Sequence, residues 1–187
     1  MRRYHLVALS LCALLSLASA QQTIGPYWHL IEDPQWADLT RFGAEGPAIV
    51  LQGRLLDGSA APACDACVEL WQADPPACQT FPAFGRSATD TEGKFRFRTL
   101  KPGPMRGQGN AAEAPHVVLA IHARGLTKPL FTRVYFANEP LNDTDPLLGL
   151  IADPARRASL IATSSEPDIW HIDIRLSGEG ETVFLEL

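Results

Sequence analysis

Two histidines, His116 and His122, lie in the apolar stretch EAPHVVLAIHARG at residues 113–125, which has the composition of a β-strand. Imidazoles are common metal ligands, so this pair is the first candidate for a metal site. Side chains two apart on a strand share a face, and two strand ligands for one ion would be spaced as H-x-H. That second position is Val118, and His122 lies four residues beyond it, on the order of 13 Å at the rise of a strand. We therefore expect a hydrogen-bonded His116 in a pocket wall and a surface His122 at a strand end.

The cysteines give a second, weaker metal signal. Cys64 and Cys67 have C-x-x-C spacing and Cys78 follows, but a structural zinc ion needs four ligands and no second pair is nearby. A disulfide or buried thiols are the expected state of these residues. The sequence contains no G-x-S-x-G nucleophile elbow, no G-x-G-x-x-G after a strand and no P-loop, which leaves hydrolase and nucleotide-binding functions without support.

Charge and length narrow the function classes further. The chain has 187 residues and a formal net charge of -5, and no basic stripe of the kind that binds nucleic acid. Arg156 and Arg157 form an isolated basic pair, which we place on the solvated face of a helix. The length fits one domain with a full core. No nucleic-acid partner is expected.

The N-terminus is typical of a secretory signal. Arg2 and Arg3 precede an apolar run at residues 6–17, which is followed by small residues at 18–20. This order predicts cleavage after Ala20, and the run is too short to span a membrane as a stable helix. We expect residues 1–20 to be a signal-peptide-like segment and residues 21–187 to be the mature domain, located in the periplasm or secreted.

The remaining sequence predicts short strands separated by turn residues. In residues 94–100, for example, Phe95 and Phe97 alternate with Arg96 and Arg98, which is the pattern of a half-buried strand. Asp153 and Pro154 predict the start of a short helix in the stretch DPARRASLIA, residues 153–162, with Leu160 and Ile161 on its apolar side. About seven strands predict an all-β fold, an antiparallel β-sandwich with short helical decorations. The expected strands lie within residues 48–56, 67–74, 91–103, 116–123, 130–136, 170–176 and 181–187.

A set of motifs spread over the mature chain resembles the intradiol ring-cleavage dioxygenases. They are TIGPYW at 23–28, DG at 57–58, VELWQAD at 68–74, FGRSATDTEGKFRFRTLKPGP at 84–104, APH at 114–116, TRVYF at 132–136 and GEGETVF at 178–184. Each motif is weak alone, but together and in this order they are specific. Within the family, the set is most similar to the α subunits of the protocatechuate 3,4-dioxygenases.

The resemblance implies an enzyme that opens catechol-type rings between the two hydroxyls, with a non-haem ferric ion held by two tyrosines and two histidines. At the matching positions this chain has Gln79, Met105, His116 and Val118, so only His116 remains as a vestigial ligand position. The three tyrosines, Tyr4, Tyr27 and Tyr135, lie outside the ligand motifs. The resemblance therefore implies a chain that binds no iron and is inactive alone, whose partner is an iron-bearing β subunit.

The same resemblance implies a role for this chain in substrate binding. In the family the pocket lies between α and β subunits, and the α chain lends its N-terminal segment and one arginine to the wall around an aromatic acid. By motif, the substrate-binding residues are Thr23, Gly25, Pro26, Tyr27 and Arg133. A Gly-Pro pair gives a rigid turn that a ligand can approach, and an arginine fork can pair with a carboxylate.

Two alternatives remain open on the sequence. The signal-like N-terminus favours an exported, transthyretin-like β-sandwich binding module without enzymatic activity, whereas the family expectation is a cytoplasmic enzyme. An iron enzyme with a remodelled site would need His29, His116 and an acidic residue to converge, and no spacing demands that.

Overall fold

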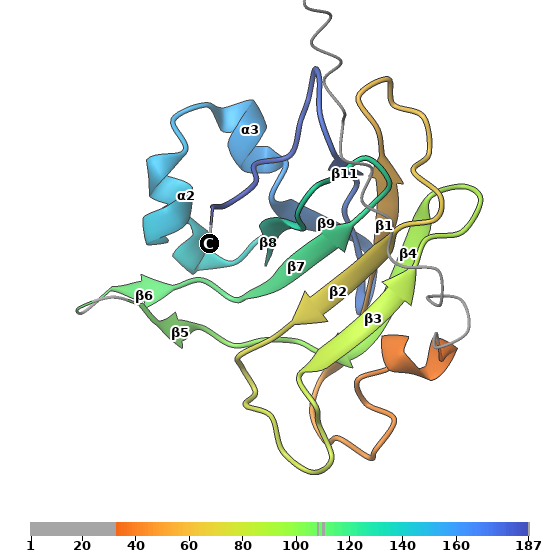
Figure 1. Cartoon of the computed structure of the whole chain (residues 1–187). Helices are drawn as coiled ribbons and strands as arrows, with labels where there is room; N and C mark the ends of the chain where they lie inside the picture. Colours follow the sequence, from red (N-terminus) through yellow and green to blue (C-terminus); the bar gives the residue numbers. More distant parts are fainter. Residues whose placement is uncertain (1–32, 108, 110, 187) are drawn as a thin grey trace, which may run out of the picture.

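A computed structural model describes residues 33–107, 109 and 111–186. The signal-like segment and the expected site residues Thr23, Gly25, Pro26, Tyr27 and His29 lie outside this part of the chain. Figure 1 shows layered β-strands with two short helices on one flank. No helix in the described part is long and apolar enough to cross a membrane.

Eleven strands and four short helices make up the described chain. The strands are β1 (Ala48–Leu56), β2 (Cys67–Trp71), β3 (Phe84–Ala88), β4 (Lys94–Leu100), β5 (Met105–Arg106), β6 (Ala112–Glu113), β7 (His116–His122), β8 (Leu130–Phe136), β9 (Ile161–Glu166), β10 (Ile169–His171) and β11 (Ile174–Arg175). The helices are η1 (Pro34–Ala37), η2 (Pro140–Asp143), α2 (Pro146–Leu150) and α3 (Pro154–Ala158).

The strands form two layers that are joined through β9. One layer runs β4-β1-β10-β9 and the other runs β8-β7-β2-β3, because β9 pairs with β10 on one side and with β8 on the other. Most pairs are antiparallel, and β1 with β10, β1 with β11, and β8 with β9 are parallel. The prediction of an all-β sandwich with short helical decorations is confirmed.

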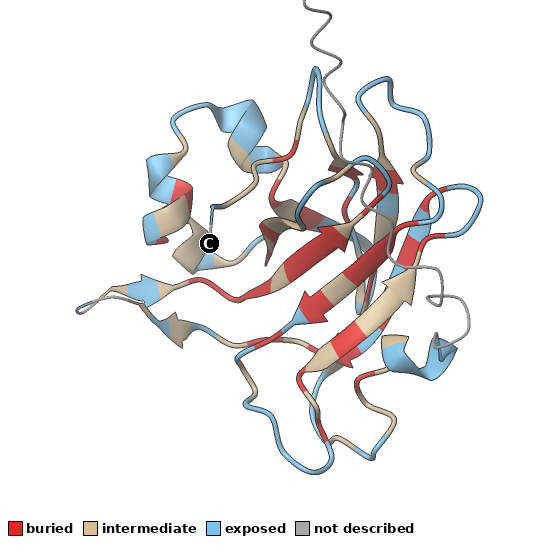
Figure 2. Cartoon of the chain, viewed as in Figure 1, coloured by how far each residue is buried: buried red, intermediate tan, exposed pale blue. Residues whose placement is uncertain are grey.

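The main core lies between the two layers and follows the alternation of the strands (Figure 2). Gly53 shows how closely the chain packs here, since a Cβ at this position would lie 1.6 Å from the carbonyl oxygen of Ile172. The central buried side chains are Leu51, Leu55, Val68, Leu70, Phe95, Phe97, Val117, Leu119 and Val134.

A second, smaller cluster lies outside the sandwich, beneath α2 and α3. It buries Tyr135 with Ala114, Leu148 and Leu160. Each helix begins with an aspartate that accepts hydrogen bonds from the first-turn amides and is followed by proline, a strong start signal. This cluster turns the outward side of the β8 carboxyl end into a buried environment.

Several element predictions differ from the structure in detail. The helix ends at Ala158, and Ile161 instead begins β9, where it pairs with Tyr135. The strand predicted at 170–176 is divided into β10 and β11. The strand predicted at 181–187 is reduced, in the part described, to one bridge between Phe131 and Leu185.

Candidate functional site

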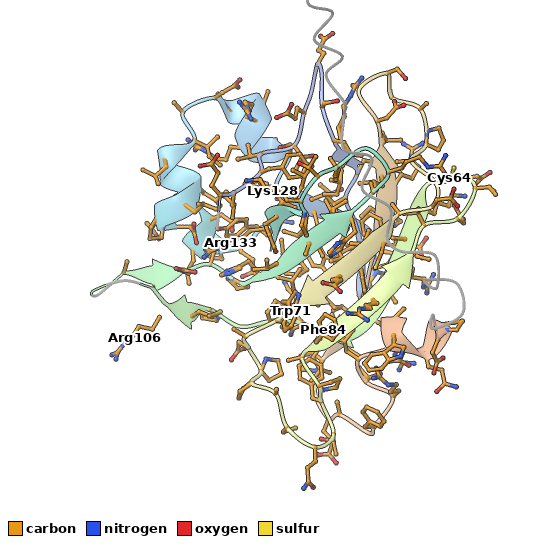
Figure 3. The ribbon with its side chains drawn as sticks, in the orientation of Figure 1. Cys64, Trp71, Phe84, Arg106, Lys128 and Arg133 are labelled. Atoms are coloured by element: carbon orange, nitrogen blue, oxygen red, sulfur yellow. The ribbon has the colours of Figure 1, made fainter. Side chains whose placement is uncertain are left out.

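Arg133 ends a row of four side chains on the outward face of the β3-β2-β7-β8 layer. The strand register aligns Phe84 with Trp71, Trp71 with Val118, and Val118 with Arg133. The rings of Trp71 and Phe84 contact each other with centroids 4.3 Å apart, and Trp71 is 50% exposed (Figure 3). The row therefore combines exposed aromatic surface, a small apolar side chain and a cation.

Arg133 is held through one of its terminal nitrogens. Its Nη1 donates to Glu113 Oε2 at 2.8 Å and to the Tyr135 hydroxyl at 3.4 Å. Burial alone would lower the pKa of Arg133, but the hydrogen bond with Tyr135 and the nearby negative charges raise it above its ordinary value. Among the described residues, no hydrogen bond involves Nε or Nη2, and these two nitrogens form one edge of the planar fork that binds carboxylates bidentately.

Tyr135 links Arg133 to the second cluster. Its hydroxyl donates to Asp145 Oδ1 at 3.0 Å. Burial raises the pKa of the Tyr135 phenol well above its ordinary value, so the phenol keeps its proton at neutral pH. Asp145 also accepts hydrogen bonds from the amides of Ala114, Leu147 and Leu148 at 2.9 to 3.1 Å. The chain from Asp145 through Tyr135 to Arg133 is thus anchored at the first turn of α2.

His116 lies beside this chain and is buried, with 5% exposure. Its Nδ1–H donates to the carbonyl oxygen of Ala114 at 2.8 Å, and its ring centroid is 5.4 Å from that of Tyr135. Nε2 lies 3.7 Å from Glu113 Oε2. Burial lowers the pKa of His116 below its ordinary value, so its imidazole is neutral near pH 7. The expectation of a hydrogen-bonded histidine holds.

One other residue singled out in the sequence, Met105, lies beside this cluster, because it pairs with Glu113 between β5 and β6. His122 ends β7, partly exposed, with Nε2 3.4 Å from Glu69 Oε2. Met105 opens β5, and Gln79 is exposed in the connection between β2 and β3. Within residues 33–107, 109 and 111–186, no group of three or more His, Cys, Asp or Glu side chains is placed to hold a metal ion.

The structure also shows the burial of the three cysteines and the contacts of the basic pair at 156–157. Cys64 and Cys78 are exposed free thiols, and Cys67 is buried in β2. Arg156 is exposed, as expected for a solvated helix face. Arg157 instead turns back and donates through Nη2 to the carbonyl oxygen of Ile151 at 2.7 Å.

Two residues of the site, Glu113 and Asp145, were not predicted from the sequence. Asp145 precedes Pro146 just as Asp153 precedes Pro154, so the same helix-start signal was available for it. Glu113 carries no local signal, because its contact with Arg133 depends on the pairing of β7 with β8. The carboxylate of Glu113 reaches Arg133 only once β7 and β8 have paired in the folded chain.

Comparison with known proteins identifies the family of this chain. Residues 32–171 match the family model described as Dioxygenase. The chain is 36% identical to the protocatechuate 3,4-dioxygenase alpha chain of Pseudomonas putida, over 88% of this chain and 94% of that one. It is 32% identical to the protocatechuate 3,4-dioxygenase beta chain of Burkholderia cepacia, over 73% of this chain and 67% of that one.

A solved structure agrees with the fold. The dioxygenase domain of a dioxygenase carbohydrate-binding protein fusion from Streptomyces sp. SirexAA-E superposes with a TM-score of 0.60 and 27% identity, covering 86% of this chain and 98% of that one. The sequence and the structure therefore agree, and the chain belongs to the intradiol ring-cleavage dioxygenase family.

Proposed function

We propose that this chain is the α subunit of a protocatechuate 3,4-dioxygenase-type enzyme and completes the substrate pocket of an iron-bearing β subunit. One observation carries the proposal. Arg133 keeps its Nε–Nη2 edge open for a ligand, and the residue paired with it, Val118, has an alkyl side chain that cannot bind a metal ion. The identity of 36% to an alpha chain supports the same assignment.

The side chains at the four ligand positions of the family do not fit a ferric ion. Gln79, Met105 and Val118 supply an amide, a thioether and an alkyl group, and only His116 supplies an imidazole. Fe(III) favours anionic oxygen donors, and the Tyr135 phenol keeps its proton because burial raises its pKa. We therefore place the iron in the β subunit and assign this chain the binding and orientation of the substrate.

Arg133 is the residue to which we assign the substrate carboxylate. Glu113 and Tyr135 both accept hydrogen bonds from Nη1 and so fix the plane of the guanidinium, while Nε and Nη2 remain for a bidentate contact. The N-terminal residues Thr23, Gly25, Pro26 and Tyr27 are proposed to line the same pocket. The β subunit would supply the ion that activates the catechol ring for attack by O2.

Iron content tests the division of labour between subunits. The chain is purified alone, and then after co-expression with a family β subunit that has all four ligands. We expect a colourless chain alone and a red-brown complex that contains iron and consumes protocatechuate. Iron bound stoichiometrically by the chain alone would overturn the proposal and direct attention to ligands around His116.

Substitution of Arg133 tests the carboxylate contact in the assembled enzyme. Charge-assisted hydrogen bonds contribute about 1.5–3 kcal/mol, so Arg133→Ala should raise KM for protocatechuate about tenfold or more. Catechol, which has no carboxylate, should show little change. Arg124→Ala is the control, because Arg124 pairs with Asp65 outside the row. An unchanged KM for protocatechuate in Arg133→Ala would refute the assignment.

The signal-like N-terminus favours a second candidate, an exported binding module. It predicts a chain that stays colourless and does not associate with any β subunit of the family. The co-expression experiment therefore separates the two functions in one preparation.

A further inference from the structure

A groove of about 930 Å³ opens on the β4-β1-β10-β9 layer, the other layer from Arg133. Four polar side chains cross its floor, one from each strand. The register pairs Arg96 with Gln52, Gln52 with His171, and His171 with Thr163. Directly paired residues place their side chains about 5 Å apart on one face, so the four form a continuous polar row from guanidinium to hydroxyl.

Neighbouring contacts orient the cationic end of the row. Arg96 Nη1 donates to Gln52 Oε1 at 3.0 Å, and Gln52 Nε2 lies 3.3 Å from the nearer ring nitrogen of His171. The amide of Gln52 thus bridges a guanidinium and an imidazole across three strands. In the described chain, no carboxylate lies within 4.0 Å of the Arg96 guanidinium, and its remaining N–H groups are available to a ligand.

The other cations of the groove are already neutralised. Arg54 Nη2 lies 2.6 Å from Asp173 Oδ2, and Lys94 pairs with Glu92. Arg96 is therefore the cation that has only a neutral protein partner. Two carboxylates line the groove: Asp173 pairs with Arg54, and Asp90 Oδ1 accepts hydrogen bonds from the backbone amides of Glu92 and Lys94 at 2.8 Å.

The size and the chemistry of the groove define a class of ligand. Pockets for small molecules occupy about 300–1,000 Å³ and combine apolar walls with a few convergent polar groups. Phe95 and Ile172 contribute to the lining here. A guanidinium fork recognises a carboxylate, whereas an amide, an imidazole and a hydroxyl exchange hydrogen bonds with hydroxyl groups.

We propose that this groove binds a small hydroxylated carboxylic acid, with the carboxylate on Arg96 and the hydroxyls along Gln52, His171 and Thr163. The groove shares no lining residue with the row that ends in Arg133, although Ser87 and Ala88 of β3 contribute to its lining.

Isothermal titration calorimetry on the full chain tests the site. The probes are D-glucuronate and L-malate, with D-glucose as the neutral counterpart of glucuronate and sulfate as a bare anion. We expect both acids to bind more tightly than glucose and sulfate. Arg96→Gln should raise the Kd of both acids about tenfold or more. Arg98→Gln is the matched control: Arg98 is exposed on the same face of β4 but outside the groove.

Thr163→Val tests the hydroxyl end without changing charge, and it should weaken binding of the acids but leave sulfate unaffected. Melting temperatures of all three variants establish that they fold. The proposal is overturned if neither acid binds, if Arg96→Gln and Arg98→Gln weaken binding equally, or if sulfate binds as tightly as the acids, which would mean an adventitious ion only.

Discussion

The carboxylate of Asp145 is the most informative single target in the molecule. It is 1% exposed and accepts four hydrogen bonds, from the Tyr135 hydroxyl and the amides of Ala114, Leu147 and Leu148. Loss of a helix cap costs about 1 kcal/mol. The Asp145→Ala change also leaves two further buried donors, those of Tyr135 and Ala114, without partners, at about 1–3 kcal/mol each.

These contributions add to about 3–7 kcal/mol of lost stability. For a chain of this size, each kcal/mol lowers the melting temperature by about 2–4 °C, so Asp145→Ala should melt at least about 6 °C below the wild type. Differential scanning calorimetry measures this shift.

Asp153→Ala is the matched control. Asp153 also precedes a proline and caps a five-residue helix, but it is exposed and accepts one hydrogen bond, from the amide of Ala155 at 2.8 Å. We expect a loss of about 1 kcal/mol and a shift of about 2–4 °C. If the melting temperatures of the two variants differ by less than about 2 °C, the buried hydrogen bonds of Asp145 do not add to the stability of the chain beyond an ordinary helix cap.

Three further predictions follow from other parts of the molecule. Burial lowers the pKa of His116 below its ordinary value of 6.5, so the unfolded chain binds a proton on this ring at a higher pH than the folded chain. The contribution of the neutral ring to the free energy of unfolding is therefore fully present above the ordinary pKa and is lost as pH falls through the lowered pKa. Urea unfolding between about pH 7.5 and pH 5 should therefore show a smaller acid loss in His116→Gln than in the wild type, and equal losses would contradict the burial argument. Gly53→Ala should fail to give soluble folded protein, because its Cβ would lie 1.6 Å from the Ile172 carbonyl oxygen. A soluble Gly53→Ala variant with the wild-type melting temperature would refute this packing. The control is Gly149→Ala in α2, where an added Cβ would meet nothing within 4 Å; it should raise the free energy of unfolding by about 1 kcal/mol. N-terminal sequencing of the cell-made protein should begin at Gln21 in the exported fraction, and an intact Met1 would remove the basis for export.

Local patterns predicted the strands in which buried and more exposed residues alternate over most of the length. The strand at β1 has the predicted bounds, and in β4 Phe95 and Phe97 are buried between exposed Arg96 and Arg98. These strands pack one face on the core, so the sequence itself carries the period of two.

Elements defined by distant partners were harder to predict. The sequence IATSSE of β9 has weak alternation, and its conformation depends on pairing with β8 and β10. In the site, the motif resemblance identified Arg133, but its contacts with Glu113 and Tyr135 required the register of β7 with β8. Tertiary pairing, rather than local propensity, sets those positions.

The segment after η1 has a consequence for self-association. Strand β4 ends its layer, and its outer edge is met by Asp38, which forms a parallel bridge with Arg98, and by Leu39, whose amide donates to the Arg98 carbonyl oxygen at 2.8 Å. Unpaired strand edges recruit strands from other molecules and so lead to aggregation. Leu39 is fully buried, so a foreign strand could pair at Arg98 only by extracting Leu39 from the core. The segment after η1 thereby protects the edge of β4 at Arg98 against pairing with another molecule.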